Sequence, residues 1–183
     1  MHDDAARWDD RYRSASPRGS LAPEPLAERG DLAELVPTAG LAIDIACGLG
    51  RQSLWLAQRG LHVVALDVSP VAVELLRAAA TEAGLGRLVD ARVTDLDAGL
   101  PAEPSVADVI VCQRFRQPAL YPLIAQRLAV GGIAIVTVLS ETGAVAPGPF
   151  HAPPGELVEA FAGLDLLYAS EGDGVATIVA SRN

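Results

Sequence analysis

Short apolar runs alternate along most of the chain with segments whose apolar residues recur at helical spacing. The apolar runs predict strands covered on both faces, at residues 41–45, 61–66, 88–93, 106–112 and 133–139. The segments between them predict helices at residues 51–59, 69–83 and 119–129. Strands that alternate with helices form a parallel sheet with right-handed crossovers, so the pattern predicts an α/β protein.

Local signals place the helix ends. Ser69-Pro70 predicts a helix start, with serine as the cap and proline at the first helical position. Gly60 and Gly84 predict the ends of two helices, and Gly131-Gly132 predicts the stop of the third.

Both ends of the chain have a different pattern. At the N-terminal end, residues 3–13 predict a short helix in which Trp8 and Tyr12 share a face, and residues 26–36 predict a second helix. At the C-terminal end, a loop over 140–154 precedes a short helix over 155–161. Two apolar runs then flank Glu171-Gly172-Asp173-Gly174, which predicts a β-hairpin.

The stretch from Leu41 to Arg51 predicts a buried strand, a glycine turn and a helix start. Gly48 and Gly50 allow the backbone to turn sharply and to approach a ligand closely. A dinucleotide site uses a similar turn to face a pyrophosphate, which the carboxylate of Asp44 would repel. Asp44 instead favours a ligand that carries an ammonium or a sulfonium.

Asp44-Ile45-Ala46-Cys47-Gly48-Leu49-Gly50 resembles the first motif of class I S-adenosylmethionine-dependent methyltransferases, and strand-end acids follow at Asp67 and Asp95. The resemblance implies a Rossmann-like, doubly wound, mostly parallel seven-stranded sheet with a C-terminal antiparallel hairpin. It implies one methyltransferase domain over residues 1–183. Its parts are a helical lid segment (1–36), a cofactor-binding core (39–139) and an acceptor-side region (140–183).

The same resemblance implies roles for individual residues. Asp67 would accept hydrogen bonds from both ribose hydroxyls, and Asp95, with Asp97 as a competitor, would accept from the adenine amino group beside Leu96. Asp44 would hold the methionine ammonium, directly or through water. The cofactor-binding set is Asp44, Ala46, Gly48, Gly50, Asp67, Val68, Asp95, Leu96 and Cys112. Each acid also has a plainer interpretation, as a cap, a turn residue or a buried carboxylate that accepts from loop amides.

The acceptor side is less defined. Arg114 and Arg116 follow the fourth strand, where this family often contacts its acceptor, and Trp8 and Tyr12 would cover the cofactor from the N-terminal helix. The segment is loosely similar to the tellurite-resistance type of methyltransferase. It lacks the proline and aromatic pattern of DNA amino-methyltransferases, and the chain lacks the acidic metal cluster of catechol-type enzymes. Either arginine can equally be solvated or pair with a nearby acid.

Composition narrows the function classes. With 183 residues, half of them hydrophobic, the chain favours one domain with a full core. A net charge of −9 argues against a nucleic-acid or anionic-membrane surface, and the absence of lysine excludes a lysine base. The acidic start, without a membrane-length apolar run, favours a cytoplasmic protein.

Few residues offer further chemistry. His151 is the only plausible histidine base, although a surface histidine explains it as well. Cys47 and Cys112 are expected to be small buried hydrophobes, and no spacing supports a metal site. The sequence therefore predicts methyl transfer to a small-molecule nucleophile. The alternatives are an NAD-dependent oxidoreductase, against which Ser53 and Asp44 argue, and a non-catalytic S-adenosylmethionine-binding protein. The acceptor and the oligomeric state stay open.

Overall fold

The computed structural model describes residues 2–14, 19–24, 26, 27 and 29–183. One sheet contains all of its strands, which are β1 (Leu41–Ile45), β2 (His62–Asp67), β3 (Val89–Val93), β4 (Ala107–Gln113), β5 (Leu128–Leu139), β6 (Asp165–Gly172) and β7 (Val175–Ser181). The strand order is β3-β2-β1-β4-β5-β7-β6. β1 to β5 pair in parallel, and β7 is antiparallel to both of its neighbours. The predicted mixed seven-stranded sheet is confirmed.

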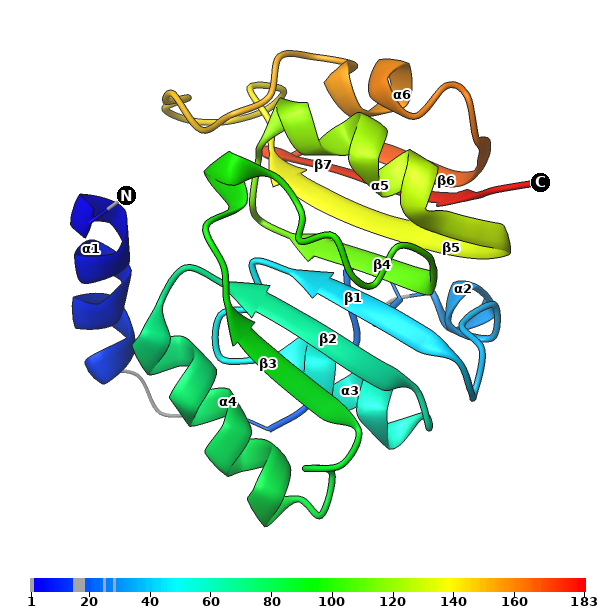
Figure 1. Ribbon diagram of the computed structural model, residues 1–183. Helices are drawn as coiled ribbons and strands as arrows, with labels where there is room; N and C mark the ends of the chain where they lie inside the picture. Colours follow the sequence, from blue (N-terminus) through cyan, green and yellow to red (C-terminus); the bar gives the residue numbers. More distant parts are fainter. Residues whose placement is uncertain (1, 15–18, 25, 28) are drawn as a thin grey trace.

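Helices lie on both faces of the sheet (Figure 1). One face is covered by α3 (Arg51–Gln58) and α4 (Pro70–Glu82), and the other by α5 (Tyr121–Arg127) and α6 (Glu156–Ala160). Successive strand residues point to opposite faces, so Ala42 packs with the α3 and α4 layer and Ile43 with the α5 and α6 layer. Because both faces are buried, the central strands are apolar throughout, as the sequence pattern indicated.

The C-terminal strands form the predicted hairpin. Asp173 and Gly174 connect β6 to β7, with φ values of 51° and 78°. Two central residues at positive φ are typical of the tight turn that matches the twist of an antiparallel pair. Glycine and aspartate tolerate this conformation, which explains why the short sequence signal was sufficient.

Two predicted boundaries were wrong. The helix predicted over residues 26–36 is reduced to α2 (Gly30–Ala33), and residue 28 of that range lies outside the described part of the chain. The carbonyls of Ala33 and Val36 accept hydrogen bonds from the Arg59 guanidinium, at 3.1 and 3.0 Å, instead of continuing a helix. The extended backbone of Arg29, with φ −119° and ψ 88°, sets the other end.

Gly131 and Gly132 lie inside β5 instead of stopping α5, which ends at Arg127. A Cβ at Gly132 would stand 3.0 Å from the carbonyl oxygens of Ala129 and Asp108, so glycine favours the close approach of the backbone here. The register between β4 and β5 also shifts here, between Ala107 and Val109. The glycines therefore mark an irregular strand start.

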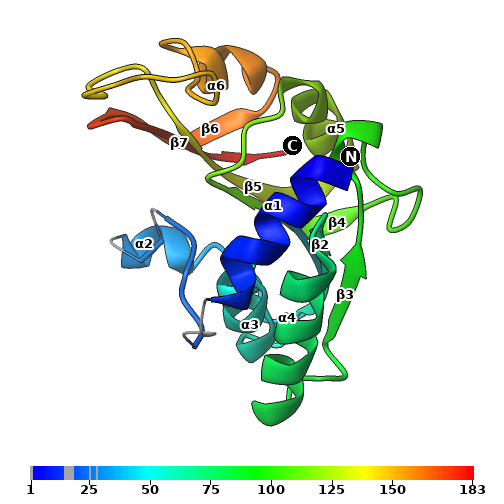
Figure 2. The ribbon, with the colours of Figure 1, turned by 90° about the vertical axis from the view of Figure 1, so that its left-hand side faces the viewer.

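The carboxyl ends of β1, β2, β4 and β5 point to one edge of the sheet, and α1 (His2–Arg13) lies in front of that edge (Figures 1 and 2). α1 contacts α4 there. Residues 19–24, here called the N-terminal strap, cross the same edge. The Leu21 amide donates to the Arg51 carbonyl at 3.0 Å, and the Glu24 amide donates to Gln113 Oε1 at 3.0 Å.

None of the helices within the described ranges is long and apolar enough to cross a membrane.

Candidate functional site

The turn between β1 and α3 is built from backbone in the left-handed region. Ala46, Gly48 and Gly50 have φ values of 55°, 52° and 73°. Gly50 is also the residue before α3, and a Cβ on it would stand 2.1 Å from Leu76 Cδ1 of α4. Glycine at this position therefore allows α3 and α4 to pack together.

Asp44 lies beneath this turn and not at the strand end. It is the fourth residue of β1 and is 2% exposed. Ser53 Oγ of α3 donates to Asp44 Oδ2 at 2.5 Å. Burial raises the pKa of Asp44 to about 7; the Ser53 hydrogen bonds oppose the rise, and the neighbouring Asp67 adds to it. Ser53, which does not fit the dinucleotide fingerprint, thus holds the acid in place.

Asp67 ends β2 and faces the glycine turn directly. Its Oδ2 accepts from the Gly48 amide at 2.8 Å, and its Oδ1 accepts from the Ser69 amide at 2.9 Å. Burial raises the pKa of Asp67, while these amide hydrogen bonds oppose the rise. Each carboxylate oxygen has two acceptor sites, so two amide bonds leave room for two further donors.

Asp95 lies further along the same edge, beyond the end of β3. The Asp95 carboxylate accepts from the Asp97 amide at 3.1 Å and begins a 3₁₀ turn, Leu96–Ala98. Leu96 is 5% exposed, and the Thr94 amide donates to the Asp67 carbonyl at 2.8 Å. The segment that contains Asp95 is thereby fixed to the end of β2, where Val68 follows Asp67.

α1 covers the glycine turn from outside the sheet. The rings of Trp8 and Tyr12 stack with centroids 5.7 Å apart. The Tyr12 hydroxyl lies 2.9 Å from the point where a Cβ at Gly48 would stand. Burial raises the pKa of Tyr12 well above its ordinary value, and the charge of Asp67 acts in the same direction. The Tyr12 side chain is therefore uncharged at neutral pH and packs beside the turn.

Cys47 and Cys112 are both buried, at 6% and 2% exposure, and neither forms a disulfide. Cys112 lies near the end of β4, where it pairs with Ile45 of β1. Its Sγ donates to the Phe115 carbonyl at 3.4 Å. Burial raises the pKa of each thiol, and the charge of Asp44 adds to both. Thiols that stay protonated are poor nucleophiles, which fits their expected role as small hydrophobes.

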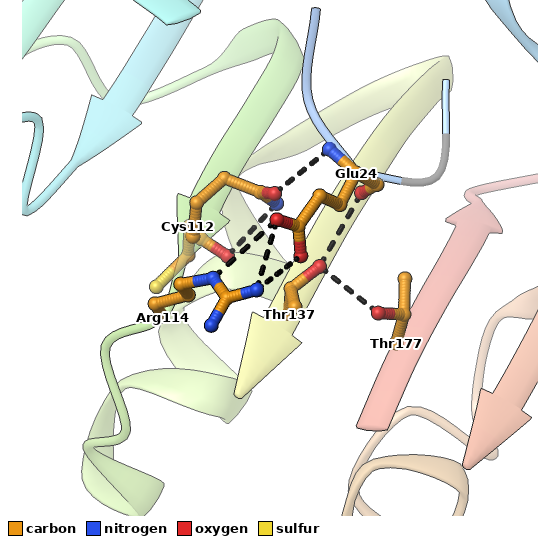
Figure 3. Close-up of polar contacts among 6 residues, drawn as sticks. Glu24, Cys112, Arg114, Thr137 and Thr177 are labelled. Carbon is orange, nitrogen blue, oxygen red and sulfur yellow. Dashed lines mark hydrogen bonds and ion pairs between the residues drawn. The ribbon is translucent and has the colours of Figure 1, made fainter. Parts of the chain in front are cut away.

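Arg114 follows β4 and binds the N-terminal strap (Figure 3). Its φ is 57°, its amide donates to the Thr137 carbonyl at 2.7 Å, and its guanidinium pairs with Glu24 at 3.0 Å. Thr137 Oγ1 also donates to the Glu24 carbonyl at 3.3 Å. Both charged side chains are about half exposed, at 54% and 45%. The pair joins the strap to the ends of β4 and β5.

Arg116 belongs to a more buried cluster. Its Nε donates to Glu156 Oε1 at 2.8 Å, and its second contact is to Glu156 Oε2. The Tyr121 hydroxyl donates to Glu156 Oε1 at 2.8 Å. The hydrogen bonds from Arg116 hold the pKa of Glu156 below its ordinary value. The two arginines that the sequence placed together therefore have separate partners and different exposure.

His151 lies in the loop after β5. Its Nδ1 accepts from the Gly148 amide at 2.9 Å, which leaves Nε2 as the ring nitrogen that carries the proton. The loop is closed at its base by a bridge between Ser140 and Ala152. Across the described residues, no three histidine, cysteine or acidic side chains are grouped to hold a metal ion.

Sequence reasoning missed several residues at this edge. Asp9 accepts from Ser69 Oγ and, at 3.3 Å, from the Val71 amide, and so caps α4 from α1. Glu24 and Glu156 pair with the two arginines. No local pattern identifies these acids, because their partners lie 60, 90 and 40 positions away. The Ser69 cap itself was predicted correctly, since Ser69 Oγ accepts from the Ala72 amide at 3.1 Å.

Comparison with known proteins places this site in a family. The family described as a methyltransferase domain matches residues 42–132. A ubiquinone biosynthesis O-methyltransferase of Xylella fastidiosa (strain 9a5c) is 28% identical over 141 residues, which are 74% of this chain and 55% of the relative. One from Azoarcus sp. (strain BH72) is 30% identical over 103 residues, 54% of this chain and 43% of the relative. The chain thus spans about half the length of the curated relatives it matches.

Solved structures share the fold. TehB from Haemophilus influenzae superimposes with a TM-score of 0.76 at 19% identity, over 96% of this chain and 67% of that one. A geranyl diphosphate C-methyltransferase from Streptomyces coelicolor A3(2), solved with S-adenosyl-L-homocysteine, gives 0.73 at 14% identity, over 100% and 98%. At these identities the likeness concerns the fold alone.

The chain belongs to the class I S-adenosylmethionine-dependent methyltransferases, as its first motif indicated. S-adenosylmethionine is the cofactor of this family. The acceptor groups at the turn fit that molecule, because Asp67 has acceptor capacity left for two hydroxyls. Gly48 has no side chain of its own, and the space that a Cβ there would fill lies against the Tyr12 hydroxyl of α1.

Proposed function

We propose that the protein transfers the methyl group of S-adenosylmethionine to a small-molecule nucleophile. The observation that carries this proposal is the glycine turn with the Asp67 carboxylate bonded to it, at the point where the chain order reverses between β1 and β4. Open α/β sheets bind their ligands at such a switch point. When bound, the cofactor supplies a methyl group already activated by a sulfonium, so the protein mainly positions the reactants and excludes water.

The residues of the core have separate tasks in this proposal. Asp67 accepts from the ribose hydroxyls, and Asp44 faces the methionine ammonium, directly or through water. The backbone at Ala46, Gly48 and Gly50 lies against the methionine portion. The adenine end is left to Val68, Asp95 and Leu96, and Cys112 forms the floor at the end of β4.

The acceptor is placed between the loop 113–118, the loop 140–154 and α1. Arg114 is the cation best able to engage it, because its exposed pair with Glu24 is weakly held and can exchange. An arginine fork suits a carboxylate or another oxyanion. Arg116 is bound by Glu156 within a partly buried cluster, so its role is instead to hold α6 against the segment that follows β4. His151 is the candidate base for an acceptor of high pKa, but it can act only once its Nδ1 is released from the Gly148 amide. A thiolate or other anion needs no base.

A small acceptor is also supported by the names of similar proteins, which act in ubiquinone biosynthesis or on geranyl diphosphate. The competing proposal is a non-catalytic protein that binds the cofactor. No observation at the site supports this alternative. An NAD-dependent oxidoreductase is not favoured, because the acid beneath the turn is kept in place by Ser53.

A screen of small acceptors, read by cofactor-dependent release of S-adenosylhomocysteine, tests the proposal. Thermal unfolding with each ligand separates the alternatives, because a ligand at 100 times its Kd adds about 2.7 kcal/mol. Stabilisation by S-adenosylmethionine together with turnover of a small acceptor is the expected outcome. Stabilisation by NADH alone would contradict the cofactor, and binding without turnover of any acceptor would favour the non-catalytic protein.

A further inference from the structure

Asp9 joins α1 to the first turn of α4. Its Oδ1 accepts from the Ser69 hydroxyl and from the Val71 amide, the latter at 3.3 Å, and its side chain is 15% exposed. The first turn of a helix has amides without intrahelical partners, and a carboxylate there is favoured by the helix dipole. α4 already has Ser69 as its own cap, so Asp9 supplies a second acceptor from a distant part of the chain.

Ser69 also connects this contact to the cofactor site. Its hydroxyl donates to Asp9, while its amide donates to Asp67 Oδ1 at 2.9 Å. Asp67 is the acid that is proposed to hold the ribose. The two acids therefore share one residue, and the position of α1 is linked to the geometry of the ribose acceptor.

Tyr12 lies one helical turn after Asp9 and is seated against the glycine turn. Its hydroxyl stands 2.9 Å from the position of a Cβ at Gly48, and its ring stacks on Trp8. Figure 2 shows α1 across the edge where the strands end, beside α4. An anchor at Asp9 fixes the part of α1 from which Trp8 and Tyr12 extend.

We propose that Asp9 is a positioning residue of the cofactor site, which fastens α1 as a closed cover over the glycine turn and so slows release of the cofactor. The proposal rests on the proposed function only in that the ligand is S-adenosylmethionine or its product. It adds a residue and a contact outside the cofactor-binding set. If a docked α1 raises the affinity for the ligand, the ligand must raise the docking of α1 by the same factor.

The neighbouring acid provides a matched control. Asp10 is on the same helix but is 77% exposed, and its partner is Arg13 at 2.5 Å. Asp9→Ala removes the acceptor and keeps helix propensity, Asp9→Asn keeps an oxygen that can accept both hydrogen bonds, and Asp10→Ala removes a similar charge without touching α4.

The test measures the dissociation rate of S-adenosylhomocysteine by stopped flow, together with trypsin cleavage after Arg11. We expect Asp9→Ala to dissociate roughly tenfold faster than wild type, Asp9→Asn to lie closer to wild type, and Asp10→Ala to stay within about twofold. The ligand should slow cleavage after Arg11 in wild type and Asp10→Ala, and much less in Asp9→Ala. A merely structural role would lower ligand-free stability without changing this protection.

Each other outcome has a definite meaning. Equal dissociation rates and equal protection for Asp9→Ala and Asp10→Ala overturn the role of Asp9 and leave the proposed function intact. If wild type does not bind S-adenosylhomocysteine at all, the proposed function fails, and the role of Asp9 fails with it.

Discussion

Asp44 and Asp67 lie at or near the carboxyl ends of neighbouring strands, yet their carboxylates have different surroundings. Asp44 is held by one hydroxyl beneath the turn, whereas Asp67 accepts from two backbone amides at its rim. The residue types and their spacing predict both acids as cofactor-binding residues. Their pKa values depend on burial and on each other, which the spacing does not reveal.

The buried acid predicts a stability profile. The pKa of Asp44 is raised to about 7, so between about pH 4 and pH 7 the folded state binds a proton that the unfolded state releases. Unfolding free energy is therefore expected to fall as the pH rises through this window, by a few kcal/mol at most. Asp44→Asn keeps an acceptor for Ser53 and should flatten the profile, measured by urea unfolding between pH 5 and pH 8. Parallel profiles for Asp44→Asn, wild type and the exposed-site control Asp10→Asn would contradict the prediction.

Asp67 and Asp95 are expected to contribute unequally to cofactor binding. Asp67→Ala removes the proposed acceptor for two hydroxyls, each bond to a charged group contributing roughly 1.5–3 kcal/mol. Asp95→Ala removes at most one such bond, and Asp97 stands two residues away to replace it. Calorimetry with S-adenosylhomocysteine should show a loss of a hundredfold or more for Asp67→Ala and a clearly smaller one for Asp95→Ala. Equal or reversed losses would refute the assignment of the ribose acid.

Among the elements, those with strong periodicity were predicted well and those shaped by tertiary contacts were not. β1, α4 and the β6–β7 hairpin follow from apolar runs, a Ser-Pro start and a turn at Asp173-Gly174. α2 is short, and the Arg59 guanidinium binds the carbonyl of its last residue, Ala33, and that of Val36 in the turns that follow. Gly132 was predicted to be part of a helix stop, but it lies inside β5, where a side chain would crowd the Asp108 carbonyl. A glycine in the sequence indicates that the backbone is unusual at that position, but it does not indicate which neighbouring residue makes glycine favourable there.

Two glycines separate these requirements experimentally. Gly50 and Gly84 share a φ of 73°, but a Cβ at Gly50 would stand 2.1 Å from Leu76, whereas Gly84 has nothing within 4 Å. Gly84→Ala should cost only the left-handed backbone penalty of about 1–2 kcal/mol. Gly50→Ala should cost that plus about 1–3 kcal/mol for the overpacked contact between α3 and α4. Urea midpoints measure both, and similar losses would show that α4 yields to the added methyl group.

Across the whole molecule, the N-terminal strap and α6 both contact the end of β4 and the segment that follows it. The N-terminal strap reaches Gln113 and Arg114 over 89 and 90 positions, and α6 reaches Arg116 over 40. The sequence predicts a cofactor-binding core over residues 39–139 and a helical lid segment over residues 1–36. It did not indicate which charges meet, because pairing at such separations is decided by the assembled fold and by no local pattern.

The two arginines at this edge should therefore differ in what they stabilise. Arg116→Ala leaves Glu156 with Tyr121 in a partly buried place, and we expect it to lower the unfolding free energy by about 1–3 kcal/mol at neutral pH. Since Arg116 holds the pKa of Glu156 below its ordinary value, this contribution should vanish as the pH falls through the folded pKa of Glu156. Arg114→Ala breaks only an exposed pair and should cost less than about 1 kcal/mol. Urea unfolding of both variants at neutral and acidic pH measures the difference. Equal losses at neutral pH would mean that the N-terminal strap depends on its ion pair as strongly as α6 depends on its own.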